Sequence, residues 1–309
     1  LWGKRRARVQ AAQSEALAAG LRAGQQRWWS AGQLAQVYSA AEASERRYAL
    51  ATEALSLIEQ DAQAVGALVK EGREATLRGI QAQSEVESAR ASLDEARAIR
   101  DAAFARLGAW AMLPEPVTTV GDSLLDREPK ALVVQANEPL SVQVAQAELE
   151  AASRLVTVEK RRALPDVSAA VGLRRFEETG DDAMTAGITL TVPLFDRNRG
   201  GIRAAYADQR AAEARLMAQK QAAQADRLAA QAALQASNSR TRAADSGVAT
   251  AEEAYRLSRV GFDAGRISQL ELRSSRAALI AARNAAVDAR QARVMAEIDL
   301  ALLEGRAPF

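Results

Sequence analysis

Residues 165–195 read PDVSAAVGLRRFEETGDDAMTAGITLTVPLF, and this stretch decides the fold. Apolar and alanine residues alternate with polar or small ones on both sides of the charged segment 177–182. Such alternation around a polar turn is typical of a β-hairpin. Each arm has about ten residues, the length of a tilted strand that crosses a membrane. A soluble hairpin packed on helices fits the alternation equally well.

The isolation of this hairpin favours the membrane interpretation. No other part of the sequence alternates in the same way, so the two strands stand between helical segments. Two strands alone leave both edges of the sheet without hydrogen-bond partners. We therefore expect other chains, or a further hairpin, to complete the sheet.

The segments on either side of the hairpin are predicted to be long helices. Alanine and other strong helix formers dominate them, and all seven prolines lie outside residues 1–113 and 194–307. One helix is expected from residue 4 to about residue 70, with a reversal around Gly66 and Gly72. A second is expected from about residue 75 to Leu107, ended by Gly108, and a third from Ser141 to about residue 163. Residues 109–140 contain four prolines and are expected to be rich in loops.

The chain repeats one design at a constant spacing of 193 residues. Residues 1–4, Leu-Trp-Gly-Lys, correspond to residues 194–197, Leu-Phe-Asp-Arg, and matches continue over about ninety positions. Other pairs are Arg6 and Arg199, Val9 and Ile202, Arg22 and Arg215, Glu59 and Glu252, Gly72 and Gly265, Leu77 and Leu270, and Arg90 and Arg283. Because residues 194–197 follow the hairpin, we expect a corresponding hairpin ahead of residue 1.

Composition excludes several classes of function. The 41 basic and 39 acidic residues are interspersed and give a net charge of +2, so no nucleic-acid partner is expected. Cysteine and histidine are both absent, which excludes disulfides, thiolate metal sites and histidine-based catalysis. We therefore expect neither an enzyme nor a bound metal or cofactor. No run of 18 apolar residues predicts a transmembrane helix.

Several stretches resemble a known family. Residues 172–180 and 192–201 resemble the TolC-like outer-membrane efflux proteins, and more specifically their CzcC-like heavy-metal branch. Tyr255, residues 264–268 and Leu270 resemble the helix-reversal signature of this family, and residues 71–73 with Leu77 resemble a weaker first copy. The resemblance covers the whole chain but lacks the N-terminal helices and first hairpin of the family.

The resemblance implies a mainly α-helical fold with a small β part. Long helical hairpins would form a trimeric α-barrel that crosses the periplasm, and each protomer would add four strands to a twelve-stranded outer-membrane β-barrel. The expected segments are a first-repeat helical hairpin (1–108), an equatorial loop segment (109–140), a second-repeat helix (141–164), the membrane hairpin (165–195) and a second-repeat helical hairpin (196–309).

The function implied is that of an outer-membrane duct that extends into the periplasm and passively exports substrate. The substrate expected from the branch is divalent heavy-metal cations, although organic compounds remain open. Expected partners are two further copies of the chain, a periplasmic adaptor (membrane fusion) protein, an inner-membrane RND-type pump and outer-membrane lipid. A periplasmic adaptor or helical scaffold of an export complex is the alternative, but two hairpin copies and one strand pair count against it.

The resemblance also implies three groups of site residues. The helix tips that would contact the adaptor comprise Gly72, Arg73, Leu77, Gly265, Arg266, Ile267, Ser268 and Leu270. Glu271 matches the acidic position of the periplasmic gate, although a solvated carboxylate or an ion pair with Arg78 explains it equally well. The membrane-interface residues would be Trp2, Phe195, Arg197 and Arg199. Both arginines begin a helix, where the helix dipole disfavours cations, so either anionic lipid or acidic neighbours should offset them.

Overall fold

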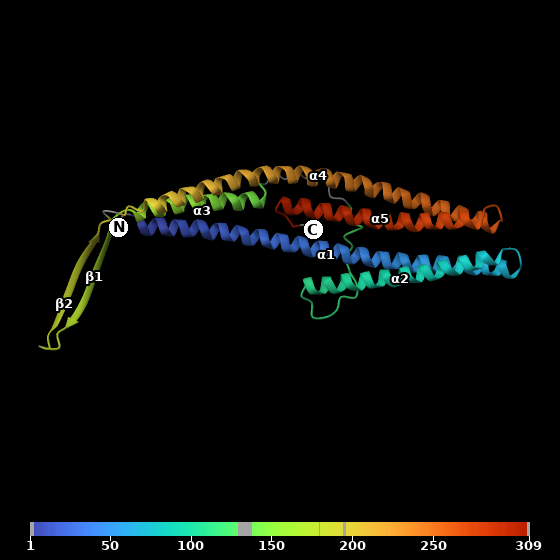
Figure 1. The fold of residues 1–309 in the computed structure, drawn as a ribbon, viewed down its shortest axis with the longest axis horizontal. Coiled ribbons are helices and arrows are strands. Elements are labelled where there is room, and N and C mark those ends of the chain that lie inside the picture. The colour runs from blue at the N-terminus through green and yellow to red at the C-terminus, as the bar shows by residue number, and fades with distance from the viewer. Residues whose placement is uncertain (1–2, 129–137, 179, 194–195, 308–309) are drawn as a thin grey trace. The chain divides into compact units, whose positions relative to one another are not determined.

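The structure is a computed structural model that describes residues 3–128, 138–178, 180–193 and 196–307. The described residues form five helices and one two-stranded antiparallel sheet. In chain order the elements are α1 (Lys4–Lys70), α2 (Thr76–Trp110), α3 (Leu140–Arg162), β1 (Asp166–Arg175), β2 (Asp182–Thr191), α4 (Arg199–Asp263) and α5 (Gln269–Leu303) (Figure 1). The expectation of long helices around a single hairpin is confirmed.

The internal repeat of the sequence is also a repeat of structure. Helices α2 and α5 both have 35 residues, and both of their ends are 193 residues apart. The ends of α1 and α4 keep the same spacing, at Lys70 and Asp263. Beyond α2 and α5 the chain reverses through the left-handed residues Met112 (φ 50°) and Gly305 (φ 65°), again 193 residues apart.

Two expected boundaries are wrong by a few residues. Helix α2 does not stop at Gly108 but continues to Trp110, because the left-handed residue that ends it is Met112. The amide of Leu113 then donates to the carbonyl of Gly108, 3.0 Å away, which closes the last turn. Helix α3 begins one residue early, at Leu140, with Pro139 as its N-cap residue.

The chain divides into two compact units, and α1 and α4 each contribute to both. The first unit comprises residues 1–27 and 136–226, and thus the start of α1, α3, the hairpin and the start of α4. Its buried residues are mostly small, namely Ala7, Ala11, Ala18, Ala145, Ala147, Ala151, Val156, Ala205 and Ala212. Small side chains allow close approach of helices but bury little area each, so the unit depends on many shallow contacts.

The second unit comprises residues 28–135 and 227–309. Within it α1 lies antiparallel to α2, and α4 antiparallel to α5 (Figure 1). Its core holds three clusters of buried side chains, built around Val294 and Ile298, around Phe104 and Leu107, and around Leu272 and Leu279. None of the helices in the described ranges contains an apolar stretch long enough to cross a membrane.

Candidate functional site

The hairpin sorts its side chains onto two chemically different faces. Its register pairs Asp166 with Thr191 at one end and Arg175 with Asp182 at the other. Alternate pairs therefore place apolar residues on one face and small or polar residues on the opposite face. The apolar face comprises Val167, Ala169, Val171, Leu173, Met184, Ala186, Ile188 and Leu190. The alternation inferred from the sequence is confirmed.

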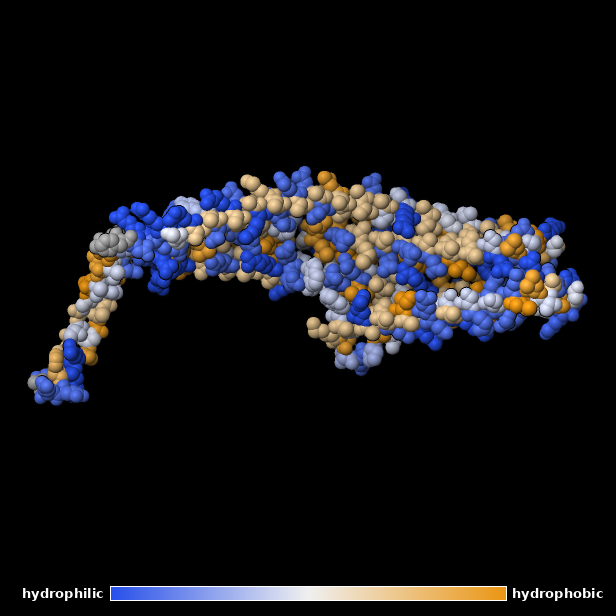
Figure 2. Space-filling model, viewed as in Figure 1, coloured by the Kyte–Doolittle hydropathy of each residue, from blue (hydrophilic) through white to orange (hydrophobic). Residues whose placement is uncertain are grey.

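The apolar face of the hairpin has no cover within the described residues. Leu173 is 84% exposed and Ile188 is 81% exposed. Figure 2 shows apolar residues along the hairpin and hydrophilic residues at its turn. Exposed large apolar side chains at this density indicate a surface that meets a non-aqueous environment or another protein. The sheet has only β1 and β2, so the outer edge of each strand is open for pairing.

The two helix reversals have the same backbone geometry. At the first, Gly72 has φ +71° and the amide of Arg73 donates to the carbonyl of Leu68 at 2.9 Å. At the second, Gly265 has φ +67° and the amide of Arg266 donates to the carbonyl of Gly261 at 2.8 Å. This six-residue closure with a left-handed glycine is the Schellman motif. The glycines singled out in the sequence thus end α1 and α4.

The second reversal has a side-chain cap that the first lacks. Ser268 caps α5, and its hydroxyl accepts from the amide of Glu271 at 3.3 Å. The carboxylate of Glu271 in turn accepts from the amide of Ser268 at 2.7 Å, which completes a capping box. These hydrogen bonds hold the pKa of the Glu271 carboxyl below its ordinary value, the one from the Ser268 backbone amide contributing most. The equivalent N-cap of α2 is Ala75, which has no side-chain hydrogen bond.

The remaining residues expected at the helix tips are mostly exposed. Leu77 and Leu270, equivalent in the two repeats, are each 62% exposed. Arg73 pairs with Glu71 at 3.4 Å, and the side chain of Ile267 lies against Gly261. Glu271 forms no ion pair with Arg78 in the part of the chain that is described, so its partner is Ser268 alone.

The residues expected at the membrane interface lie at the other end of the long helices. Arg197 and Arg199 are exposed, and Arg199 is the first residue of α4. The positions of Trp2 and Phe195 fall outside the described residues. At the same end, Lys4 pairs with Asp166 at 3.2 Å and so joins the start of α1 to the start of β1.

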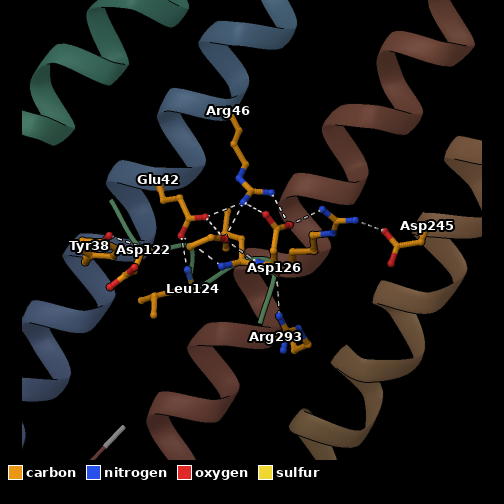
Figure 3. Close-up of polar contacts among 11 residues, drawn as sticks. Tyr38, Glu42, Arg46, Asp122, Leu124, Asp126, Asp245 and Arg293 are labelled. Carbon is orange, nitrogen blue, oxygen red and sulfur yellow. Dashed lines mark hydrogen bonds and ion pairs between the residues drawn. The ribbon is translucent and has the colours of Figure 1, made fainter. Parts of the chain in front are cut away.

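A buried carboxylate that the sequence did not single out anchors the segment after α2. Glu42 of α1 accepts hydrogen bonds from the amides of Leu124 and Leu125, at 2.8 and 3.2 Å, and from the hydroxyl of Ser123 at 2.7 Å (Figure 3). From α5, the guanidinium of Arg293, which is 2% exposed, donates to the carbonyl of Leu125 at 3.0 Å. A loop without regular structure is thus held by polar side chains that satisfy its backbone.

Asp126 extends this anchor to three helices. Its carboxylate accepts from Arg46 of α1 and from Arg290 of α5, the latter at 3.0 Å, and Arg290 also pairs with Asp245 of α4 at 2.9 Å (Figure 3). The hydrogen bond from Arg46 is the main reason why the pKa of the Asp126 carboxyl lies below its ordinary value.

A second buried ion cluster links the two repeats. The side chain of Arg276 in α5 contacts Asp61 of α1 and Glu85 of α2, and Glu85 also contacts Arg273. Arg276 is 5% exposed, so it depends on these carboxylates to compensate its burial. The one signal in the sequence was a departure from the repeat, since Gln83 is the equivalent of Arg276. Among the described residues no group of three acidic side chains could hold a metal ion.

Comparison with known proteins identifies relatives over most of the chain. A family model described as outer membrane efflux protein matches residues 134–306. The nickel and cobalt resistance protein CnrC of Cupriavidus metallidurans is 40% identical over 219 residues, 70% of this chain and 52% of that protein. The nickel-cobalt-cadmium resistance protein NccC of Alcaligenes xylosoxydans is 38% identical over 216 residues, 69% of this chain and 49% of that protein. The chain thus spans about half the length of these relatives.

The fold has counterparts among solved channels. The open-state structure of the MtrE outer membrane channel of Neisseria gonorrhoeae superposes with a TM-score of 0.87 at 20% identity, and the match covers 99% of this chain and 72% of that one. This likeness confirms the channel fold, and the metal-resistance relatives confirm the resemblance to the heavy-metal branch. The match over residues 134–306 places the protein in the outer membrane, and the chain belongs to the outer membrane efflux protein family.

Proposed function

We propose that this chain forms part of a passive duct through which substrate leaves the periplasm and crosses the outer membrane. The observation that carries the proposal is the β1–β2 hairpin, whose apolar face is exposed and whose strands are of membrane-spanning length. Helical hairpins flank it and supply the periplasmic part of such a duct. No catalytic group is needed for this function.

The open edges of the sheet support assembly with further strands. An outer-membrane barrel has no free edge, because unpaired backbone groups in lipid are costly. With the second hairpin expected from the sequence repeat, each chain would contribute four strands. Three chains would then close a barrel of twelve, so we propose a homotrimer.

We propose that the cargo is divalent nickel or cobalt. The support is the 40% identity to a nickel and cobalt resistance protein. Metal selection would belong to the inner-membrane pump, which the duct would meet through a periplasmic adaptor protein. Exposed leucines at the two reversals, Leu77 and Leu270, support adaptor contact there. They are large apolar residues without cover in the described part of the chain.

We propose Glu271 as the acidic residue of the periplasmic gate. Its lowered pKa keeps the carboxylate charged, and it is exposed at the start of α5. Three such carboxylates in a trimer would attract cations and repel one another. The bond to Ser268 would fix where each carboxylate lies.

Conductance in planar bilayers tests the duct. The full-length protein should form pores, and the two faces of the hairpin offer a matched pair of variants. Ile188→Lys places a cation on the apolar face, where it should cost about 2–4 kcal/mol near the bilayer centre and prevent insertion. Thr189→Lys places the same charge on the polar face and should insert, with altered ion selectivity. Absence of pores in the unchanged protein, or equal insertion of both variants, would refute the proposal.

Metal sensitivity tests the cargo. Deletion of the gene should sensitise cells to nickel and cobalt, and the unchanged gene should restore resistance. Dyes and antibiotics serve as the control compounds. Sensitivity to these organic compounds without any change toward metals would contradict a metal cargo while leaving the duct intact.

A further inference from the structure

Three helix ends gather positive charge at the base of the hairpin. Helices α1 and α4 begin there, at Lys4 and Arg199, and α3 ends there with Lys160, Arg161 and Arg162. Their proximity to the hairpin is covalent, because α3 ends at Arg162 and β1 begins at Asp166. We call the exposed cations at these ends the basal cluster, comprising Arg5, Arg6, Arg8, Lys160, Arg161, Arg162, Arg197, Arg199 and Arg203.

Most of this charge is not neutralised inside the chain. Of the basal cluster, Arg162 lies 3.7 Å from Glu159, and Lys160 lies over the ring of Tyr206 at 4.9 Å. Six arginines have no hydrogen-bond or ion-pair partner among the described residues, namely Arg5, Arg6, Arg8, Arg197, Arg199 and Arg203.

The nearby acidic side chains are already engaged. Glu159 accepts from the side-chain amide of Asn198 at 2.6 Å, Asp166 pairs with Lys4, and Asp196 accepts from the backbone amide of Asn198 at 2.9 Å. Neither α1 nor α4 has an acidic residue in its first turn, so the positive end of each helix dipole adds to the side-chain charge. An external anion is needed to compensate this field.

The position of the cluster identifies that anion. The hairpin has its apolar face between a charged turn and the basal cluster, so membrane insertion places the cluster at the headgroup level of one leaflet. Arginine and lysine at that level attract anionic lipid phosphates. We propose that the basal cluster binds the headgroups of anionic phospholipids in the periplasmic leaflet, and so fixes the depth of the hairpin in the membrane. This rests on the proposed function, because it requires the hairpin to span the outer membrane.

Lipid binding to the purified full-length protein tests the inference. Fluorescent phosphatidylglycerol should bind more tightly than fluorescent phosphatidylcholine, and the preference should decrease as salt is raised. The triple variant Arg8→Gln, Arg199→Gln, Arg203→Gln should lose about tenfold or more of the preference. A control triple, Arg106→Gln, Arg215→Gln, Arg240→Gln, removes the same charge at exposed positions outside the cluster and should keep it.

Several outcomes would overturn the proposal. They are equal binding of both lipids by the unchanged protein, equal loss in both triple variants, and full competition by inorganic phosphate alone, which would indicate a free-anion site. Conductance of the same samples separates the two hypotheses. If the unchanged protein forms pores without lipid preference, only the basal cluster proposal fails. If it forms no pores, the duct itself fails.

Discussion

Arg283 of α5 pairs with Glu252 of α4 at 2.8 Å, and Arg90 of α2 pairs with Glu59 of α1 at 3.1 Å, 193 residues earlier. The same ion pair thus joins the two helices of each helical hairpin. All four side chains are more than a quarter exposed, so each pair contributes little to stability and mainly sets the register of its hairpin. Where the repeats differ, the differing residues make contacts that only one of them has.

The left-handed glycines at the reversals predict opposite effects for alanine at two kinds of site. Gly265→Ala and Gly72→Ala should each destabilise the protein by about 1–2 kcal/mol, because a Cβ is disfavoured at positive φ even though the space around both positions is open. Gly247→Ala, within α4 and also in open space, should stabilise it by about 0.5–1 kcal/mol. Thermal unfolding measures all three. The backbone argument fails if the three substitutions have the same sign.

The cap of α5 predicts a reciprocal pair of substitutions. Ser268→Ala removes the capping box and should cost about 1 kcal/mol of stability. Ala75→Ser introduces a hydroxyl at the equivalent N-cap of α2 and should stabilise by a similar or smaller amount. Denaturant unfolding of both variants gives the comparison. An unaffected Ser268→Ala protein would show that the cap contributes nothing in this context.

The buried ion cluster between the repeats predicts a large loss. Arg276→Gln leaves the carboxylates of Asp61 and Glu85 without their main partner and should destabilise by about 3 kcal/mol. Arg273→Gln serves as the control, because the side chain of Arg273 is far more exposed and should matter much less. Chemical unfolding of the second unit is the measurement, and equal losses would argue against a role for burial.

The anchor of the loop segment predicts a specific acid sensitivity. The pKa of Asp126 is lowered in the folded chain from its ordinary value of 3.8, chiefly by Arg46. A lowered folded pKa stabilises the fold above the unfolded pKa, and this stabilisation is lost as pH falls through the folded value. Asp126→Asn should therefore be less stable than the unchanged protein at neutral pH, and the difference should shrink below about pH 4. Unfolding followed from pH 7 to pH 3 tests this, and a difference independent of pH would contradict it.

The helices, the hairpin and the repeat could be predicted from the sequence because each has a local signature. Helix α1 was expected from residue 4 to about residue 70 and spans Lys4–Lys70, since helix propensity and the absence of proline act within a few turns. The alternation of the hairpin predicted its two faces, since side chains of a strand alternate with period two. The end of α2 was missed because Met112 adopts a left-handed conformation that its residue type does not announce.

Tertiary structure decided which charged residues have partners. Glu42, Arg276 and Arg293 look like ordinary residues of solvated helices until the fold buries them against groups far away in the chain. The partner of Glu271 also emerged only from the backbone, which brings its carboxylate to the amide of Ser268. Sequence periodicity reports which face of an element is apolar. The cost of burying a charge depends on neighbours that only the folded chain supplies.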